Sequence, residues 1–245
     1  MRRVAIVLLA LLFAIPLQAG LIIRGSGGAG CSTPDNGDYL DEGWEGTGAE
    51  NTWTLFGSGT FDQDYALPGS PPTGSCSEGL KIDADSIQSS HYWDKGSVHD
   101  RSTDLDVVCH IYVSSNTTGT SAPDLTNIIS WQLGTTPNSN VVANISLRWQ
   151  TGTTWYLRPI DLSTPSVTID LDTWYTVTMH MDGTAASSYM QVVGGGSTTC
   201  DVADECPFTR LDTVDGRYLH LGNNNATGGG INLDMSVGYC YVNSP

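Results

Sequence analysis

Alternation of apolar and polar residues is the feature that most constrains what this chain can fold into. The run DLDVVCHIYVSS (residues 104–115) places five side chains on one face of an extended strand, namely Leu105, Val107, Cys109, Ile111 and Val113. Successive strand residues point to opposite faces, so Asp106, His110 and Tyr112 share the other face. Helical periodicity is absent from residue 20 onward, and clusters of Gly, Asn, Asp, Ser, Thr and Pro separate the short apolar segments. This pattern predicts an all-β domain.

Further strands follow the same rule. ANISLRWQ and TWYLRPI predict a hairpin around residues 151–153, and SSYMQVVGGG, RYLHLGNNN and INLDMSVGYCYV predict three later strands. In WYTVTMHM the side chains of Tyr175, Val177, Met179 and Met181 share a face, and Asp182-Gly183 is a turn signal. We therefore interpret His180 and Asp182 as the end of a strand and its turn, not as a catalytic pair. Ten or more strands at this spacing predict a two-sheet antiparallel β-sandwich over residues 31–245.

The first residues resemble an export signal. Arg2 and Arg3 precede an apolar run from Val4 to Ile15, and cleavage is expected after Ala19. The alternative is a membrane anchor, but this run is shorter than the roughly 20 residues that a spanning helix needs. We expect a signal peptide over residues 1–19, a Gly/Ser-rich leader over 20–30, and a secreted or cell-surface protein whose mature chain is not inserted in a membrane.

The charge balance restricts the partners. The chain has 10 basic and 26 acidic residues, and without Arg2 and Arg3 the net charge becomes −18. Such a chain repels the phosphates of nucleic acids, so we exclude a DNA- or RNA-binding role. The same charge is compatible with cation binding, but it is also what an ordinary acidic secreted surface shows.

Six cysteines behind an export signal predict disulfides, and the lack of a CxxC pair argues against zinc. The short loop CDVADEC favours the pair Cys200–Cys206. Cys31–Cys76 and Cys109–Cys240 follow only by elimination and from the expected sheet topology. Sequons at Asn116, Asn144 and Asn225 are candidate glycosylation sites.

The C-terminal half resembles the concanavalin A-like, laminin G-like jelly-roll superfamily. The residues that carry this resemblance are Trp174-Tyr175, Asp182-Gly183, Tyr189 to Val193, Leu219 to Gly222, and Asp234. The opening DEGWEGTGAENTWTLFGSGTFDQDY, followed by GLKID, also resembles jelly-roll carbohydrate-binding modules. The resemblance implies a concanavalin A-like jelly roll. It further implies a structural calcium held by Glu45 and Asp234, for which the alternative is surface or hydrogen-bonded carboxylates.

Enzymes of the superfamily have motifs that this chain lacks. Retaining glycosidases resembling this fold carry Glu-x-Asp-x-x-Glu along one strand, whereas the nearest segment here is Asp104-Leu-Asp106-Val-Val-Cys109. Polysaccharide lyases of the fold use a Tyr/His pair with Arg and Gln neighbours, and their short motifs are also not found. We therefore assign no catalytic residue, and a divergent lyase or glycoside hydrolase is the least favoured alternative.

A binding face is the remaining candidate site. Seven polar or aromatic residues lie in phase opposite the apolar positions of their strands: Asp106, His110, Tyr112, Arg148, Gln150, Tyr156 and Arg158. If their strands are neighbours in one sheet, they line one groove in which rings stack on sugar faces and polar groups bind hydroxyls. An ordinary solvated sheet face is the alternative. The sequence thus predicts a secreted, non-catalytic lectin-like domain for carbohydrate or another extracellular surface, with a structural or adhesive protein as the alternative.

Overall fold

A computed structural model of the chain describes residues 40–42, 53–57, 59–84, 89–120, 123–159, 165–183, 188–196, 199–203, 205–210, 215–224 and 230–245. The expected signal peptide, leader, Cys31, Glu45 and Asn225 lie outside the described residues. Within these ranges every regular element is a β-strand, and no helix long and apolar enough to cross a bilayer occurs among them.

Two antiparallel sheets make up the structure, as the alternation predicted. Sheet A has the order β14-β13-β12-β6-β16-β4-β3, with β1 and β7 also paired to β16. Its strands are β1 (Leu40–Glu42), β3 (Thr60–Ala66), β4 (Glu78–Ala84), β6 (Leu105–Val113), β7 (Thr118–Gly119), β12 (Thr173–Met181), β13 (Tyr189–Gly194), β14 (Cys206–Pro207) and β16 (Ile231–Asn243).

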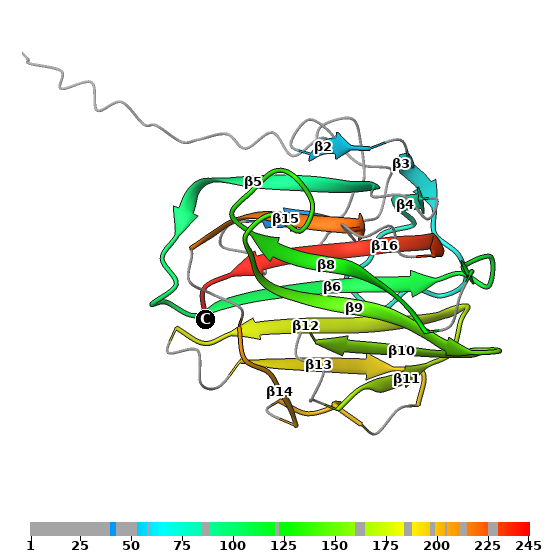
Figure 1. Cartoon of the computed structure of the whole chain (residues 1–245). Helices are drawn as coiled ribbons and strands as arrows, with labels where there is room; N and C mark the ends of the chain where they lie inside the picture. The colour runs from blue at the N-terminus through cyan, green and yellow to red at the C-terminus, as the bar shows by residue number, and fades with distance from the viewer. Residues whose placement is uncertain are drawn as a thin grey trace, which may run out of the picture.

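Sheet B has the order β11-β10-β9-β8-β15-β5-β2. Its strands are β2 (Trp53–Phe56), β5 (Ser89–His99), β8 (Asp124–Gln132), β9 (Val141–Thr151), β10 (Thr154–Pro159), β11 (Val167–Ile169) and β15 (Gly216–Asn223). Neighbouring strands are often distant in the sequence, and Figure 1 shows β8, β9 and β10 crossing in front of the central strands of sheet A.

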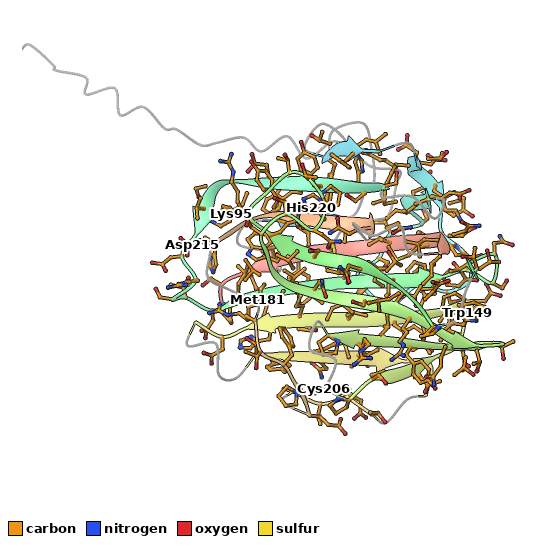
Figure 2. All side chains as sticks on the ribbon, viewed as in Figure 1. Lys95, Trp149, Met181, Cys206, Asp215 and His220 are labelled. Carbon is orange, nitrogen blue, oxygen red and sulfur yellow. A yellow bond between two sulfur atoms is a disulfide. The ribbon has the colours of Figure 1, made fainter. Side chains whose placement is uncertain are left out.

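The core lies between the sheets and uses the side chains that the alternation assigned to it. The apolar faces of β6 and β12 are at most 1% exposed, as expected, and Trp131 on β8 belongs to the same buried core. Met181, labelled in Figure 2, ends the buried face of β12. Burying this apolar surface is the main stabilising term of such a sandwich.

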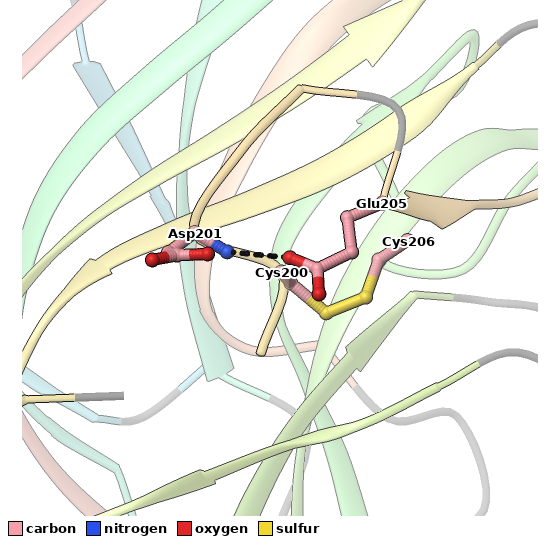
Figure 3. The surroundings of a disulfide bond; sticks show 4 residues. All are labelled: Cys200, Asp201, Glu205 and Cys206. Carbon is pink, nitrogen blue, oxygen red and sulfur yellow. Dashed lines mark hydrogen bonds between the residues drawn. A yellow bond between two sulfur atoms is a disulfide. The ribbon is translucent and has the colours of Figure 1, made fainter. Parts of the chain in front are cut away.

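Two predicted disulfides are confirmed. Cys109 and Cys240 face each other on adjacent strands β6 and β16 with a Cα–Cα distance of 4.2 Å. Cys200 and Cys206 close the short loop before β14, where the backbone N–H of Asp201 donates to Glu205 at 3.1 Å (Figure 3). Cys76 is also disulfide-bonded, and the pairing with Cys31 lies outside the described residues.

Candidate ligand-binding face

The seven expected ligand-binding residues do not line one groove. Asp106, His110 and Tyr112 lie on β6 of sheet A, whereas Arg148 and Gln150 on β9 belong to sheet B with Tyr156 and Arg158 on β10. Each set lies on the outer face of its own sheet, so the two sets point away from each other. The expectation of a shared groove was wrong because alternation identifies the outer face of a strand but not the sheet to which the strand belongs.

On sheet B the structure brings Arg148 and Tyr156 together. They are cross-strand partners on β9 and β10, and Leu125 of β8 lies opposite Arg148 on its other side. Arg148 and Tyr156 are both half-buried, and neither makes a hydrogen bond or ion pair with another described residue. Gln150 is exposed two residues further along β9. A cation, a ring and an amide are therefore available on one surface.

Buried polar side chains adjoin this pair. Arg158 faces Ser146 across the β9–β10 register and is only 6% exposed, so it forms part of the floor of this face and not of its accessible surface. The hydroxyl of Ser146 donates to Asn127 Oδ1 at 2.6 Å, and Asn144 Oδ1 lies 3.4 Å from the same oxygen. This network holds Ser146 and Asn127 in place on the outer face of sheet B.

Gln132, the last residue of β8, organises the start of the β8–β9 loop. Its Nε2 amide group donates to the carbonyls of Gly134 and Thr136, both at 2.8 Å, and its oxygen accepts from the N–H of Asn138 at 3.2 Å. These bonds fold the β8–β9 loop back over β8. Asn138 has a φ of 58°, a left-handed conformation that asparagine tolerates better than most residues.

His220 lies beside the β8–β9 loop (Figure 2) and is fully buried. His220 Nε2 lies 2.9 Å from Gln132 Nε2 and 3.2 Å from the carbonyl oxygen of Gly134, and its Nδ1 lies 3.1 Å from Ser90 Oγ. Burial lowers the pKa of His220 to about 4. The ring is thus a neutral, enclosed part of the framework and cannot itself reach a bound ligand.

Gln132, His220 and Tyr92 were not among the residues predicted from the sequence. The Tyr92 ring stacks on His220 with a centroid distance of 5.2 Å. The signal was available, because Gln132 and His220 alternate with the core residues Trp131 and Leu219. This alternation was not recognised as part of one face, because the strands that carry it become neighbours only through pairings between segments distant in the sequence. In the sheet their order is β9-β8-β15-β5.

On sheet A the three expected residues have different surroundings. A segment around residues 67–76 covers His110, whose Nδ1 lies 2.8 Å from Ser75 Oγ, and burial lowers the pKa of His110 to about 4. Asp106 lies 2.7 Å from His180 Nδ1, and this hydrogen bond raises the pKa of His180. His180 therefore pairs across strands with Asp106, in agreement with its interpretation as part of a strand.

Asp234, expected to bind calcium, forms an ion pair with Lys81 and accepts from Asn116 Nδ2 at 3.2 Å. In the part of the chain that the structure describes, no group of three or more His, Cys, Asp or Glu side chains is arranged to hold a metal. Of the sequon residues, Asn116 is exposed, whereas Asn144 is 4% exposed at the centre of sheet B. Glycosylation at these sequons stays a prediction.

Comparison with known proteins identifies the fold. No family model matches the chain, and no curated protein matches its sequence. The cellulose-induced protein Cip1 superposes over 84% of this chain and 97% of its own, with a TM-score of 0.52 and 13% identity. The fold is a concanavalin A-like jelly roll.

Other structures match this jelly roll less closely. A legume lectin-like domain from Entamoeba histolytica covers 80% of this chain and 91% of its own at a TM-score of 0.47 and 7% identity. An alginate lyase from Alteromonas sp. 272 covers 80% and 95% at 0.44 and 9%. The chain spans only 25% of the length of a Trypanosoma rangeli sialidase, with 67% of this chain matched, a TM-score of 0.41 and 14% identity. At these TM-scores and identities the three similarities support no further conclusion about this chain.

Proposed function

We propose that this protein is an exported, non-catalytic lectin-like domain that binds carbohydrate on the outer face of sheet B. The observation that carries the proposal is the cross-strand pair Arg148–Tyr156, half-buried and without a hydrogen-bonding partner among the described residues. The polar groups of both side chains are therefore available to water or to a ligand.

The chemistry of this face favours an acidic glycan. The guanidinium of Arg148 offers a planar fork of donors that matches a carboxylate or sulfate, and the Tyr156 ring can stack on the apolar face of a sugar. At the described outward positions of β8, β9 and β10 there is no Asp or Glu. In a chain of such negative charge, this face is where an anionic sugar meets the least repulsion.

The buried histidine on this face of sheet B also supports a non-catalytic role. His220 is fully buried, with both ring nitrogens engaged by Ser90 and Gly134, so it cannot exchange a proton with a sugar. Proton transfer to a substrate requires a group within hydrogen-bond reach of it.

Export is supported by the disulfides, which persist in oxidising compartments. A structural calcium at Glu45 and Asp234 remains part of the proposal. It would require the ammonium of Lys81 to move from Asp234 or to share it with the ion. Thermal melting with calcium and with a chelator tests this point, because a bound ion raises the melting temperature of the wild type but not that of Asp234→Asn.

Affinity electrophoresis of the purified protein in polygalacturonate, alginate and heparin tests the proposed ligand. We expect saturable retardation by at least one polymer, weakened about tenfold or more in Arg148→Ala and in Tyr156→Ala. Arg101→Ala is the matched control, because it removes the same charge from an exposed turn. Lack of retardation by every polymer would refute the proposal and favour a structural or adhesive role. Release of unsaturated sugars from a polymer would instead show a lyase.

A further inference from the structure

The outer face of sheet A carries a second aromatic surface, far from Arg148. Trp174 on β12 and Tyr112 on β6 are cross-strand partners, with ring centroids 5.4 Å apart and planes inclined by 51°. Both side chains are half-buried, so part of each ring is exposed to solvent. On the far side of Trp174, β13 runs into Gly194, Gly195 and Gly196, which place no side chain beside the indole.

Both rings are held in place through their polar atoms. Trp174 Nε1 donates to the carbonyl of Pro68 at 2.8 Å, and Tyr112 Oη donates to Asp172 at 3.2 Å. Because these donors are already satisfied within the protein, what the rings offer to a partner is their apolar surface. Rings fixed in advance lose little conformational entropy when a ligand binds.

Carboxylates surround this aromatic pair. Asp172 accepts the backbone N–H of Ser115 at 2.8 Å, and that bond, with the one from Tyr112, holds its pKa below the usual range. Asp234 lies on the other side, paired with Lys81. Asp83 is directly opposite Asp234 on β4 and is exposed. Lys81 is the one Lys or Arg at the described outward positions of these strands, and Asp234 neutralises it.

This charge pattern selects the kind of ligand. A uronate or sulfate would meet several carboxylates and no unpaired cation, which opposes binding. A neutral sugar has no such penalty, because it can stack its C–H face on Trp174 and donate hydroxyl hydrogens to Asp172. Tyr112 extends the apolar surface across the adjacent strand.

We propose that sheet A carries a second saccharide-binding site, centred on Trp174 and Tyr112, which binds an uncharged glycan chain. This site is independent of the face proposed on sheet B and has the opposite preference for charge. Two such faces would let one domain bind a neutral and an acidic polymer at the same time.

Affinity electrophoresis of the intact protein in hydroxyethylcellulose and in galactomannan tests the site. We expect retardation by at least one of these neutral polymers, insensitive to salt and weakened about tenfold in Trp174→Ala. Trp174→Phe should keep most of the binding because it keeps a ring. Arg148→Ala, on the opposite sheet, should leave neutral-polymer binding unchanged while it weakens binding to polygalacturonate.

Each failure is distinguishable. Wild type that passes through both neutral polymers without retardation overturns this inference and leaves the acidic-glycan site untouched. Equal loss of neutral binding in Arg148→Ala and Trp174→Ala would show one shared site in place of two. Melting curves verify that each variant is folded. If Trp174→Ala does not fold, Tyr112→Leu carries the same expectation, because it removes the exposed ring but keeps apolar volume on the sheet.

Discussion

Lowering the pH from about 7.5 to about 5 should strongly destabilise this protein, because four of its five histidines, His91, His99, His110 and His220, are buried and burial lowers the pKa of each. Burial lowers the pKa of His91, His110 and His220 to about 4 in the folded state. In the unfolded chain each returns to about 6.5. Between these values the unfolded state binds more protons than the folded state, so the free energy of unfolding falls as the pH falls.

The magnitude follows from the two pKa values. At pH 5 each of His91, His110 and His220 lowers the free energy of unfolding by about 2 kcal/mol relative to pH 7.5, and the three together by about 6 kcal/mol. His180 acts in the opposite direction, because its pKa is raised by Asp106 and its contribution is lost as the pH rises. A small domain has a total stability of about 5–15 kcal/mol. A loss of about 6 kcal/mol would therefore remove a large part of that stability and lower the urea midpoint substantially.

Urea unfolding followed by tryptophan fluorescence, at several pH values between about 5 and 7.5, measures the effect. His91→Phe is an informative variant, because His91 lies between Trp53 and Phe61 and its Nδ1 has no hydrogen-bond partner. It should reduce the loss of unfolding free energy between about pH 7.5 and about pH 5 by about 2 kcal/mol and raise the midpoint at pH 5. A free energy of unfolding that stays constant over this range would refute the assignment of buried neutral histidines.

Three further outcomes are expected. Gln132→Leu should lower the free energy of unfolding in urea by about 2–4 kcal/mol, because the β8–β9 loop loses its donors; a change below about 1 kcal/mol would contradict its role as organiser. Replacing both cysteines of the Cys109–Cys240 bond by alanine should cost about 4–5 kcal/mol, and breaking the Cys200–Cys206 bond only about 2 kcal/mol, because the first bond closes a much longer loop; the reverse order would argue against this entropic account. Asp106→Asn should shift the pKa of His180 down toward its ordinary value in an NMR titration, and an unchanged pKa would exclude Asp106 as the cause.

Much of the fold could be predicted from local patterns. Two features agree with the expected alternation and turn chemistry: the buried faces of β6 and β12, and the hairpin of β9 and β10 with Gly152 at a φ of 55°. These features depend on residues close together in the sequence, where the two-residue period and the turn preferences act directly. The disulfides Cys109–Cys240 and Cys200–Cys206 were also anticipated.

The candidate site could be predicted only in part. Arg148, Gln150 and Tyr156 were found because one hairpin holds them together, and a hairpin is a local structure. Gln132 and His220 were missed, although each lies in phase with that face. Their neighbours come from β15 and β8, which are joined by pairings across almost 90 residues. Periodicity within a strand carries no information about such a pairing.

The sequence by itself determined the class of this protein: strands with one apolar face, turns between them and cysteines that fit an oxidising compartment. Those properties depend on each short segment alone, so they do not change with the order in which the strands are arranged. Only the tertiary structure decided that β6 and β9 belong to opposing sheets, so that Tyr112 and Arg148 face away from each other. The reason is that burying apolar surface stabilises any pair of apolar faces in contact. The order of strands in a sheet depends instead on how the whole chain packs.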